Sequence, residues 1–323
     1  MTNHNTLFTN IMTFIRDGQL KFHDLRIAQT FIWAVVGVIQ SEQPHFSHWL
    51  PFRKGKAKAA SKARQFSRWI HNEKIRPMPI YQRFIQHLLR DWCDHTAYLA
   101  LDTTQLWKRF VIVRLALVYC GRAIPLGWVV CAGGSATVAV ACYQRMLAQV
   151  AAQIPTTTKV ILLADRGFGH IELLKVATQL GWHFRIRLKS DTWVFLANGQ
   201  RRQIRALMPP VGKGCCYTHV WLTKQNLGPP HLAVAHVITP NGSAKWAIVS
   251  AMNQLAATPL TSMGCASTLK KTFWTTNRLA SIWKIAACRI QWLSLDCVSY
   301  WPQLQFTWFL WRLASLHSGF VPW

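Results

Sequence analysis

The chain has 323 residues, of which 37 are lysine or arginine and 11 are aspartate or glutamate, so its formal net charge is +26. That length allows one large domain or two smaller ones, and a hydrophobic content of 51% excludes a disordered tail. A cationic surface of this size needs a polyanionic partner, most commonly nucleic acid, although a ribosomal or membrane-surface protein can show the same balance.

No apolar stretch of the sequence is long enough for a transmembrane helix. The most apolar runs, 31–39, 110–120 and 306–311, fall short of the roughly 18 to 20 residues that such a helix needs. The N-terminus shows no basic segment followed by an apolar core, and the nine cysteines include no C-x-x-C pair. We therefore expect a cytoplasmic protein with reduced thiols, no zinc ribbon and no membrane partner.

Residues 1–95 are predicted to be helical, because apolar side chains recur at intervals of three and four. Within them lies a basic run that is opposed only by Glu73 and interleaved with Phe66 and Trp69. The run consists of Arg53, Lys54, Lys56, Lys58, Lys62, Arg64, Arg68, Lys74 and Arg76. It is either a solvated face or a DNA-contacting helix with its approach loop. Because one sign dominates, we interpret residues 1–95 as a helical DNA-binding region.

From Tyr98 onward the pattern changes to strands. We expect strands over 98–102, 110–120, 126–131, 160–164 and 183–188, with helices over 136–150 and 171–180. Strand, strand, strand, helix, strand, helix, strand is the order of a ribonuclease-H-like core, so residues 96–191 are predicted to be the first part of an α/β catalytic core. Residues 192–256 are strand-like with glycine and proline turns, which indicates a β-rich insertion.

Two carboxylates, Asp102 and Asp165, each end a predicted core strand. The two strands are neighbours in this topology, so both side chains should face one point. Neighbouring carboxylates stay ionised only beside a cation, and Mg²⁺ or Mn²⁺ takes such oxygen ligands and acts on phosphodiesters. In the simpler alternative, Asp102 caps a turn and Asp165 pairs with Arg166. Their joint position in a very basic chain favours a metal site, with both residues as ligands and catalytic groups.

Three basic side chains alternate with apolar ones on the strand expected over 183–188 and just beyond it. They are Arg185, Arg187 and Lys189. They either contact the backbone of a DNA substrate or lie in solvent, and the pattern favours neither interpretation.

Four segments resemble those of a known family: L-D-T-T-Q-L-W from Leu101, V-Y-C-G-R-A-I-P-L-G-W from Val118, L-L-A-D-R-G-F-G from Leu162, and G-W-H-F-R-I-R-L-K from Gly181. They are similar to the DDE transposases of the IS-four-like insertion-sequence group, which a Y-R-E-K signature marks. The resemblance covers roughly residues 97–250. It implies a ribonuclease-H-like core with a β insertion, and Mg²⁺-dependent DNA cleavage at element ends followed by strand transfer. It also implies double-stranded DNA as the partner, a homodimer and a bacterial, nucleoid-associated location.

The third carboxylate of that family is missing from this chain. In the family the signature Y-x2-R-x3-E-x6-K lies on a helix after the insertion, and its Glu completes the metal site. Here no Glu follows Glu172, and the only acid beyond Asp191 is Asp296, whose surroundings resemble no catalytic motif. Tryptophan is also concentrated at the end of the chain, since seven of the 17 lie in the last 66 residues.

A change of reading frame accounts for both features. From Ser262, we read the last base of each codon together with the first two bases of the next. The permitted residues then spell Y-G-L-R-F-D-I-E-E-N-F-L-D-D-K, and each Trp codon gives Leu, Met or Val. We therefore infer a frameshift between Gln254 and Thr261. Residues 257–323 would be an aberrant tail that replaces the helix expected to bear the Glu; a genuine but divergent C-terminus is the alternative.

This hypothesis predicts how the chain behaves. With Asp102 and Asp165 alone, metal-dependent cleavage should be weak or absent, and a tail that was never selected for packing should make the product aggregation-prone. Two other interpretations remain open. One is a catalytically dead DNA-binding remnant that occupies transposon ends, and the other is an unrelated basic nuclease with the same core.

Overall fold

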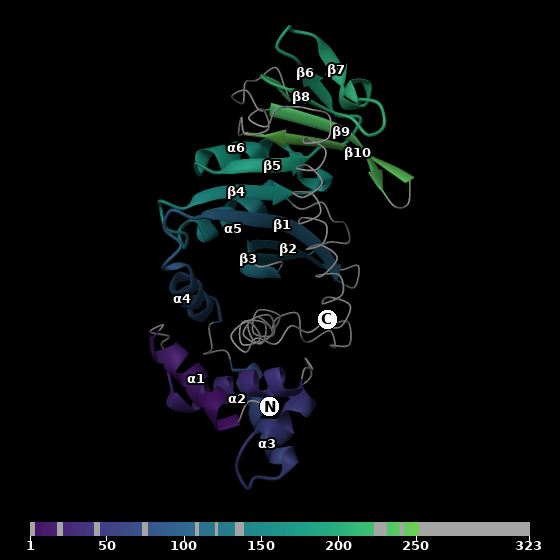
Figure 1. The fold of residues 1–323 in the computed structure, drawn as a ribbon. Helices are drawn as coiled ribbons and strands as arrows, with labels where there is room; N and C mark the ends of the chain where they lie inside the picture. The colour runs from purple at the N-terminus through teal and green to yellow at the C-terminus, as the bar shows by residue number, and fades with distance from the viewer. Residues whose placement is uncertain are drawn as a thin grey trace. The chain divides into compact units, whose positions relative to one another are not determined.

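The computed structural model describes nine stretches of the chain (Figure 1): residues 4–17, 22–41, 46–72, 77–106, 110–119, 122–132, 139–222, 231–239 and 242–251. The chain divides into two compact units, whose described parts lie within residues 1–91 and 92–251. The tail at 257–323, with its offset-frame signature and Asp296, lies outside the described residues, and so do Glu73, Lys74 and Arg76.

The described part of the first unit is built from helices. They are α1 (His4–Asp17), α2 (Leu25–Ser41), the 3-10 helix η1 (Phe46–Phe52), α3 (Ala59–Ile70) and α4 (Pro77–Leu89). Helices α2, η1 and α3 pack together through a cluster that contains Ala34, Val38, Trp49 and Phe66. Phe66 is fully buried and Trp69 nearly so, which makes both of them core residues. Although they interleave with the basic run in the sequence, both side chains are turned away from its exposed members. None of the helices that the structure describes is long and apolar enough to cross a membrane.

Helices α2 and η1 approach closely at Gly37. A Cβ atom at this position would overlap Trp49 Cβ and lie 2.9 Å from Trp49 Cγ. Alanine in place of glycine would raise helix propensity by about 1 kcal/mol, but overpacking costs about 1–3 kcal/mol. The difference predicts that Gly37→Ala lowers the free energy of unfolding by up to about 2 kcal/mol in urea denaturation. The exposed Gln29→Ala in the same helix should change it by less than about 0.5 kcal/mol, and a more stable Gly37→Ala would contradict this packing.

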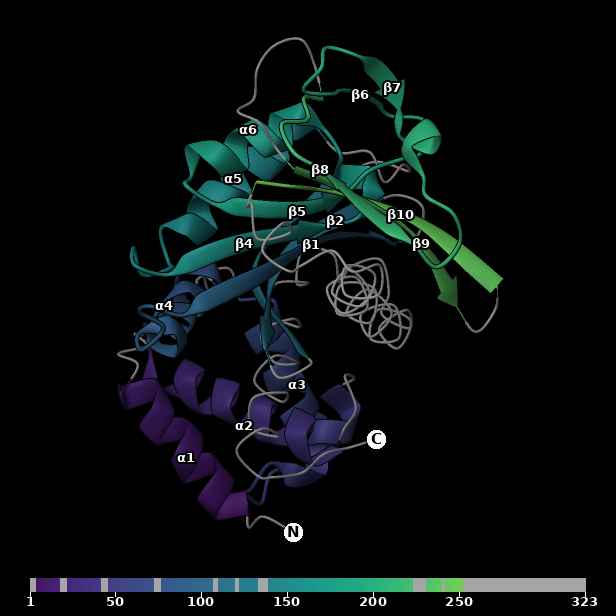
Figure 2. The same ribbon diagram turned by 45° about the horizontal axis from the view of Figure 1, so that its top comes forward.

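The second unit is organised around one eight-stranded sheet in the order β3-β2-β1-β4-β5-β10-β9-β8 (Figures 1 and 2). Its strands are β1 (Thr96–Leu106), β2 (Phe110–Tyr119), β3 (Arg122–Ala132), β4 (Lys159–Ala164), β5 (His183–Arg187), β8 (Gly214–Tyr217), β9 (His231–Thr239) and β10 (Gly242–Ser250). Strands β1, β4 and β5 are parallel, whereas β2 and β3 form an antiparallel meander on β1. The strands and helices expected over 96–191 are therefore all present, although β1 and β3 are longer than predicted and α5 begins at Val140.

The remaining described elements connect and extend this sheet. They are α5 (Val140–Ala151), the 3-10 turn η2 (Arg166–Phe168), α6 (Ile171–Gln179), β6 (Trp193–Phe195), β7 (Arg201–Gln203) and the 3-10 turn η3 (Ile204–Leu207). Strands β6 and β7 form a separate two-stranded hairpin. In contrast, β10 pairs antiparallel with β5, so much of the expected insertion is continuous with the core sheet. This pairing satisfies backbone groups that β5 would otherwise expose at a sheet edge.

Candidate functional site

Asp102 lies inside β1 and not at its end, which corrects the strand boundary expected from the sequence. Strand β1 continues to Leu106 because the residues after Asp102 keep their antiparallel pairing with β2. The parallel pairing with β4, however, stops at the pair Leu101–Ala164. Asp102 and Asp165 each follow directly after that pair, and Asp165 keeps an extended backbone, with φ −80° and ψ 172°. Both side chains therefore start from equivalent positions on the same face of the sheet.

A row of four charged residues crosses the sheet at this level. Asp102 is the register partner of Arg114 on β2. On β5, Ile186 pairs with Ala164, so the next residue, Arg187, is level with Asp165. Across β2, β1, β4 and β5 the order is Arg114, Asp102, Asp165 and Arg187. Because adjacent strands lie about 4.8 Å apart, two neighbouring carboxylates are flanked by an arginine on each side.

The charged row lies on the face of the sheet that points away from α5 and α6. Leu115 follows Arg114 in β2 and pairs with Gly127 on β3. A Cβ atom at Gly127 would lie 2.7 Å from Val150 Cγ2 of α5. The side of the sheet to which Leu115 and Gly127 point is therefore the side that α5 covers. Successive side chains of a strand alternate between faces, so Arg114 points to the opposite side. Helices α5 and α6 contact each other and therefore share the face away from the carboxylates.

Arg114 is the buried anchor of the site. Its side chain is only 4% exposed, its Nη2 lies 3.8 Å from Asp102 Oδ2, and the same nitrogen donates a 2.9 Å hydrogen bond to Thr104 Oγ1. Burial lowers the pKa of Arg114 to about 10, and the negative charge of Asp102 opposes that shift. The guanidinium is thus still protonated at neutral pH, and its charge holds the Asp102 side chain in place.

Asp165 has a looser arrangement. Its Oδ1 lies 3.7 Å from Arg187 Nη1, and its side chain is 52% exposed against 20% for Arg187. Burial lowers the pKa of Arg187, Asp165 opposes this effect and the nearby Arg166 adds to it. The ion-pair partner that the structure gives Asp165 is therefore Arg187, across the sheet, and not its neighbour Arg166. This ion pair also places Arg187 at the carboxylate site. The alternating pattern of residues 183–188 had left open whether Arg187 contacts a substrate or lies in solvent.

The two carboxylates provide oxygen donors of the kind that Mg²⁺ takes. Both remain accessible, since the side chains of Asp102 and Asp165 are 37% and 52% exposed. Within the described stretches, however, no three His, Cys, Asp or Glu side chains come together. The described site thus offers two of the three carboxylates that the family resemblance implies.

The basic run near the N-terminus is largely exposed. Lys54, Lys56 and Lys58 lie in the loop between η1 and α3. Arg64 and Arg68 stand four residues apart on the exposed side of α3, opposite the buried Phe66 and Trp69. Five of the seven predicted DNA-contacting residues that the structure describes thus present their charges to solvent. Side chains four apart share a helix face, so the two arginines can contact one surface together.

Arg53 and Lys62 behave differently from the rest of this run. Both are half-buried, and Lys62 Nζ donates a 2.6 Å hydrogen bond to the carbonyl oxygen of Arg53. Burial lowers the pKa of Arg53. Lys62 therefore fastens the start of the basic loop to α3, and this positional role was not expected from the sequence.

Sequence reasoning did not single out Arg114, although a signal for it exists. It is the one charged residue of the ten in β2, where nearly every other side chain is apolar and buried. A fully buried arginine requires a partner, so a lone arginine in such a strand indicates a carboxylate on the strand beside it.

Comparisons with known proteins find likenesses among solved structures. No family model and no curated protein matches the sequence. One similar solved structure is the cryo-EM structure of a piggyBac transposase synaptic complex with hairpin DNA. It is 12% identical with a TM-score of 0.47, and the match covers 90% of this chain and 67% of that chain. A functional assignment therefore rests on this chain's own residues.

Proposed function

We propose that this chain is a DDE-type transposase by descent, of the IS-four-like insertion-sequence group, which binds transposon ends and target DNA. The observation that supports this most is the placement of Asp102 and Asp165 directly after the last parallel pair of β1 and β4. The D-T-T and D-R-G-F segments of the family resemblance begin at these two positions. The sheet order β3-β2-β1-β4-β5, with its helices α5 and α6, supports a ribonuclease-H-like core.

In this proposal the residues of the charged row hold and orient the metal ligands. Mg²⁺ or Mn²⁺, when bound, would stabilise the negative charge of the phosphodiester during strand cleavage. Asp102 and Asp165 would hold the cation, and the buried Arg114 would fix the orientation of Asp102 through its charge. Arg187 would hold the Asp165 side chain through their 3.7 Å ion pair. The exposed side chains of the basic run would contact the phosphates of the DNA.

The missing third carboxylate favours an impaired copy. The chain has no Glu beyond Glu172, and two carboxylates give a cation fewer ligands than the family uses. A second candidate function follows from the same observation: a catalytically dead remnant that occupies transposon ends as a DNA-binding protein. In either case we propose a nucleoid-associated bacterial protein that acts as a homodimer when functional.

A cleavage assay on the DNA that flanks the gene tests this proposal. The full chain should bind this duplex and nick it weakly or not at all in Mg²⁺ or Mn²⁺. Robust nicking that Asp165→Asn abolishes would contradict the impaired state and support an active enzyme. Absence of any salt-dependent DNA binding would contradict both the transposase and the remnant.

The exposed arginines of α3 provide a quantitative test of DNA contact. We expect Arg64→Ala combined with Arg68→Ala to weaken duplex binding for every sequence. The slope of log K against log salt should become shallower by about 2, since each lost phosphate contact removes about 0.9. Fluorescence anisotropy over a series of KCl concentrations measures this slope. Arg16→Ala combined with Arg83→Ala removes the same charge from exposed positions of α1 and α4; an equal effect of this control pair would show that only net charge matters.

A further inference from the structure

The β6–β7 hairpin presents an arginine stacked on an exposed tryptophan. Phe195 of β6 pairs with Arg201 of β7, and Trp193 is the diagonal neighbour on the same face. The Arg201 guanidinium carbon lies 4.2 Å from the centroid of the Trp193 ring and 6.0 Å from that of Phe195. Trp193 remains 43% exposed. This contact holds the guanidinium against the ring, and its N–H groups form no hydrogen bond with the described residues.

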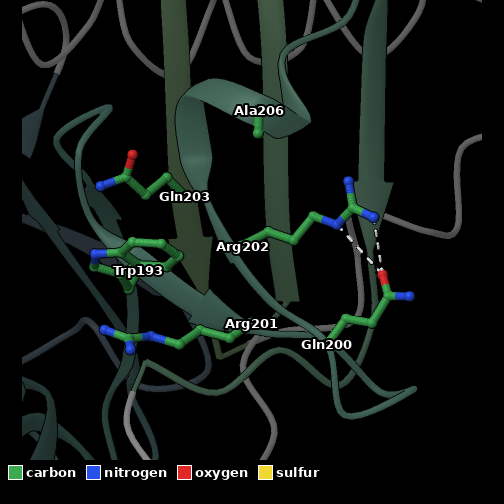
Figure 3. Close-up of a pocket in the computed structure, with 6 residues that line it drawn as sticks. All are labelled: Trp193, Gln200, Arg201, Arg202, Gln203 and Ala206. Atoms are coloured by element: carbon green, nitrogen blue, oxygen red, sulfur yellow. Dashed lines mark hydrogen bonds between the residues drawn. The ribbon is translucent and has the colours of Figure 1, made fainter.

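A second arginine is held on the other side of the same strand. Figure 3 shows that Arg202 extends away from Trp193 toward Gln200. Its Nε and Nη2 donate hydrogen bonds of 3.3 Å and 3.1 Å to Gln200 Oε1. The turn that places Gln200 is itself fixed, because Gly199 adopts a φ of +79° and the Gln200 amide donates to Asn198 Oδ1 at 3.0 Å. Arg202 is thus oriented by a partner that carries no charge.

The hairpin is anchored firmly to the rest of its unit. The Phe195 amide donates to the Trp221 carbonyl at 2.8 Å, and the Trp221 amide donates back at 2.9 Å. The Ile204 amide donates to the carbonyl of Thr192 at 3.0 Å. Val194 and Ile204 are fully buried beneath the hairpin. Because these hydrogen bonds and buried side chains hold the hairpin backbone in place, less conformational entropy would be lost when a ligand contacts the two arginines.

The charge of this surface indicates an anionic ligand. Residues 189–205 contain four basic side chains and a single acid, Asp191. In the described part of the chain, neither Arg201 nor Arg202 forms an ion pair. Both border a cavity of about 470 Å³, which is lined by Trp193, Gln200, Arg201, Arg202, Gln203 and Ala206 (Figure 3). Guanidinium groups held in a fixed plane match the geometry of phosphate oxygens.

From these contacts we infer that the β6–β7 hairpin is a second DNA-backbone contact surface, in which Arg201 and Arg202 each donate to a phosphate. The identity of the polyanion rests on the proposed function, and the net charge of +26 favours DNA over an acidic peptide. The two guanidinium groups point to opposite sides of the strand. In a duplex that lies along the hairpin, they would therefore contact different phosphates. Trp193 would act as a positioning residue that keeps Arg201 in its stacked orientation.

Duplex binding by variants of the full chain tests this surface. Anisotropy of a fluorescein-labelled duplex, at nanomolar protein and several KCl concentrations, should show that Arg201→Ala weakens binding several-fold and makes the salt slope shallower by about 1. Arg201→Lys keeps the charge and should restore most of the slope without the full affinity. Trp193→Ala should weaken binding while leaving the slope nearly unchanged, because the charge remains but its orientation is lost. The matched control is Arg145→Ala, an exposed arginine of α5.

The outcomes separate this inference from the proposed function. If the wild type binds DNA and the α3 double variant weakens binding, but Arg201→Ala equals Arg145→Ala, the hairpin surface alone is refuted. If the wild type shows no salt-dependent binding, both are refuted. If labelled poly-glutamate binds the wild type and loses affinity in Arg201→Ala, while both chains bind the duplex equally, the surface takes an acidic peptide and the inference is overturned. Far-ultraviolet circular dichroism of each variant confirms that the comparison is made between folded chains.

Discussion

A chain translated in the offset frame from residue 262 onward should cleave duplex DNA bearing its element's ends at least about 10²-fold faster than the 323-residue chain. The offset frame permits a Glu seven residues after the Tyr of the signature, and this Glu would supply the third carboxylate. A complete ligand set stabilises charge in the transition state by several kcal/mol, and each 1.4 kcal/mol changes the rate tenfold. Nicking of end-labelled duplex in Mg²⁺ measures the difference.

Asp165→Asn in the frame-restored chain is the matched control. It removes a carboxylate that is 52% exposed, so the fold should be unaffected while cleavage returns to the level of the 323-residue chain. The nucleotide sequence from codon 250 onward checks the premise directly. Stop codons in the offset frame, or a codon there that cannot encode Glu, would eliminate the frameshift hypothesis and leave the printed tail as the genuine one.

Asp102→Ala is expected to destabilise the protein far more than Asp165→Ala. The Arg114 guanidinium beside Asp102 is 4% exposed, and loss of the carboxylate removes the charge that offsets its burial. Because Asp102 is itself partly exposed, we expect a loss of about 1–3 kcal/mol, below the value for breaking a fully buried pair. The pair of Asp165 and Arg187 is solvent-screened, so Asp165→Ala should cost less than about 1 kcal/mol.

Urea denaturation of each variant, followed by tryptophan fluorescence at low protein concentration, gives the two free energies of unfolding. A rescue variant sharpens the comparison: Asp102→Ala combined with Arg114→Met replaces the buried charge with an apolar side chain of similar length and should recover part of the lost stability. Equal losses for Asp102→Ala and Asp165→Ala would contradict the asymmetry between the two ion pairs. These experiments also show why Asp165→Asn, and not Asp102→Asn, is the cleaner probe of catalysis.

The sequence was most informative where local pattern and topology agree. The buried run before Asp165 predicted β4, and the alternation after Gly181 predicted β5, because strands of this kind are specified by their own residues. The adjacency of Asp102 and Asp165 followed from placing those strands side by side. Its physical basis proved to be the last parallel pair, Leu101–Ala164, and not two strand ends.

Features that depend on long-range packing were not accessible from local pattern. The extension of β1 beyond Asp102 comes from its pairing with β2, so the polar stretch that resembled a turn is held in a strand by its neighbour. Phe66 and Trp69 stand among basic residues in the sequence, yet α3 turns them toward the core of the first unit. The lone arginine of β2 indicates a carboxylate partner, but the spacing along the chain does not identify that partner as Asp102, which lies on another strand.

The position of β10 has a consequence for how this gene could be expressed. Strand β10 ends at Ser250 and lies between β5 and β9, so the last strand of the eight-stranded sheet is translated before the inferred slip between Gln254 and Thr261. A ribosome that keeps the frame and one that slips would thus produce the same sheet, the same charged row and the same basic helix. Two proteins from one message would share every described surface for which we propose DNA contact, and would differ only in the segment after the slip.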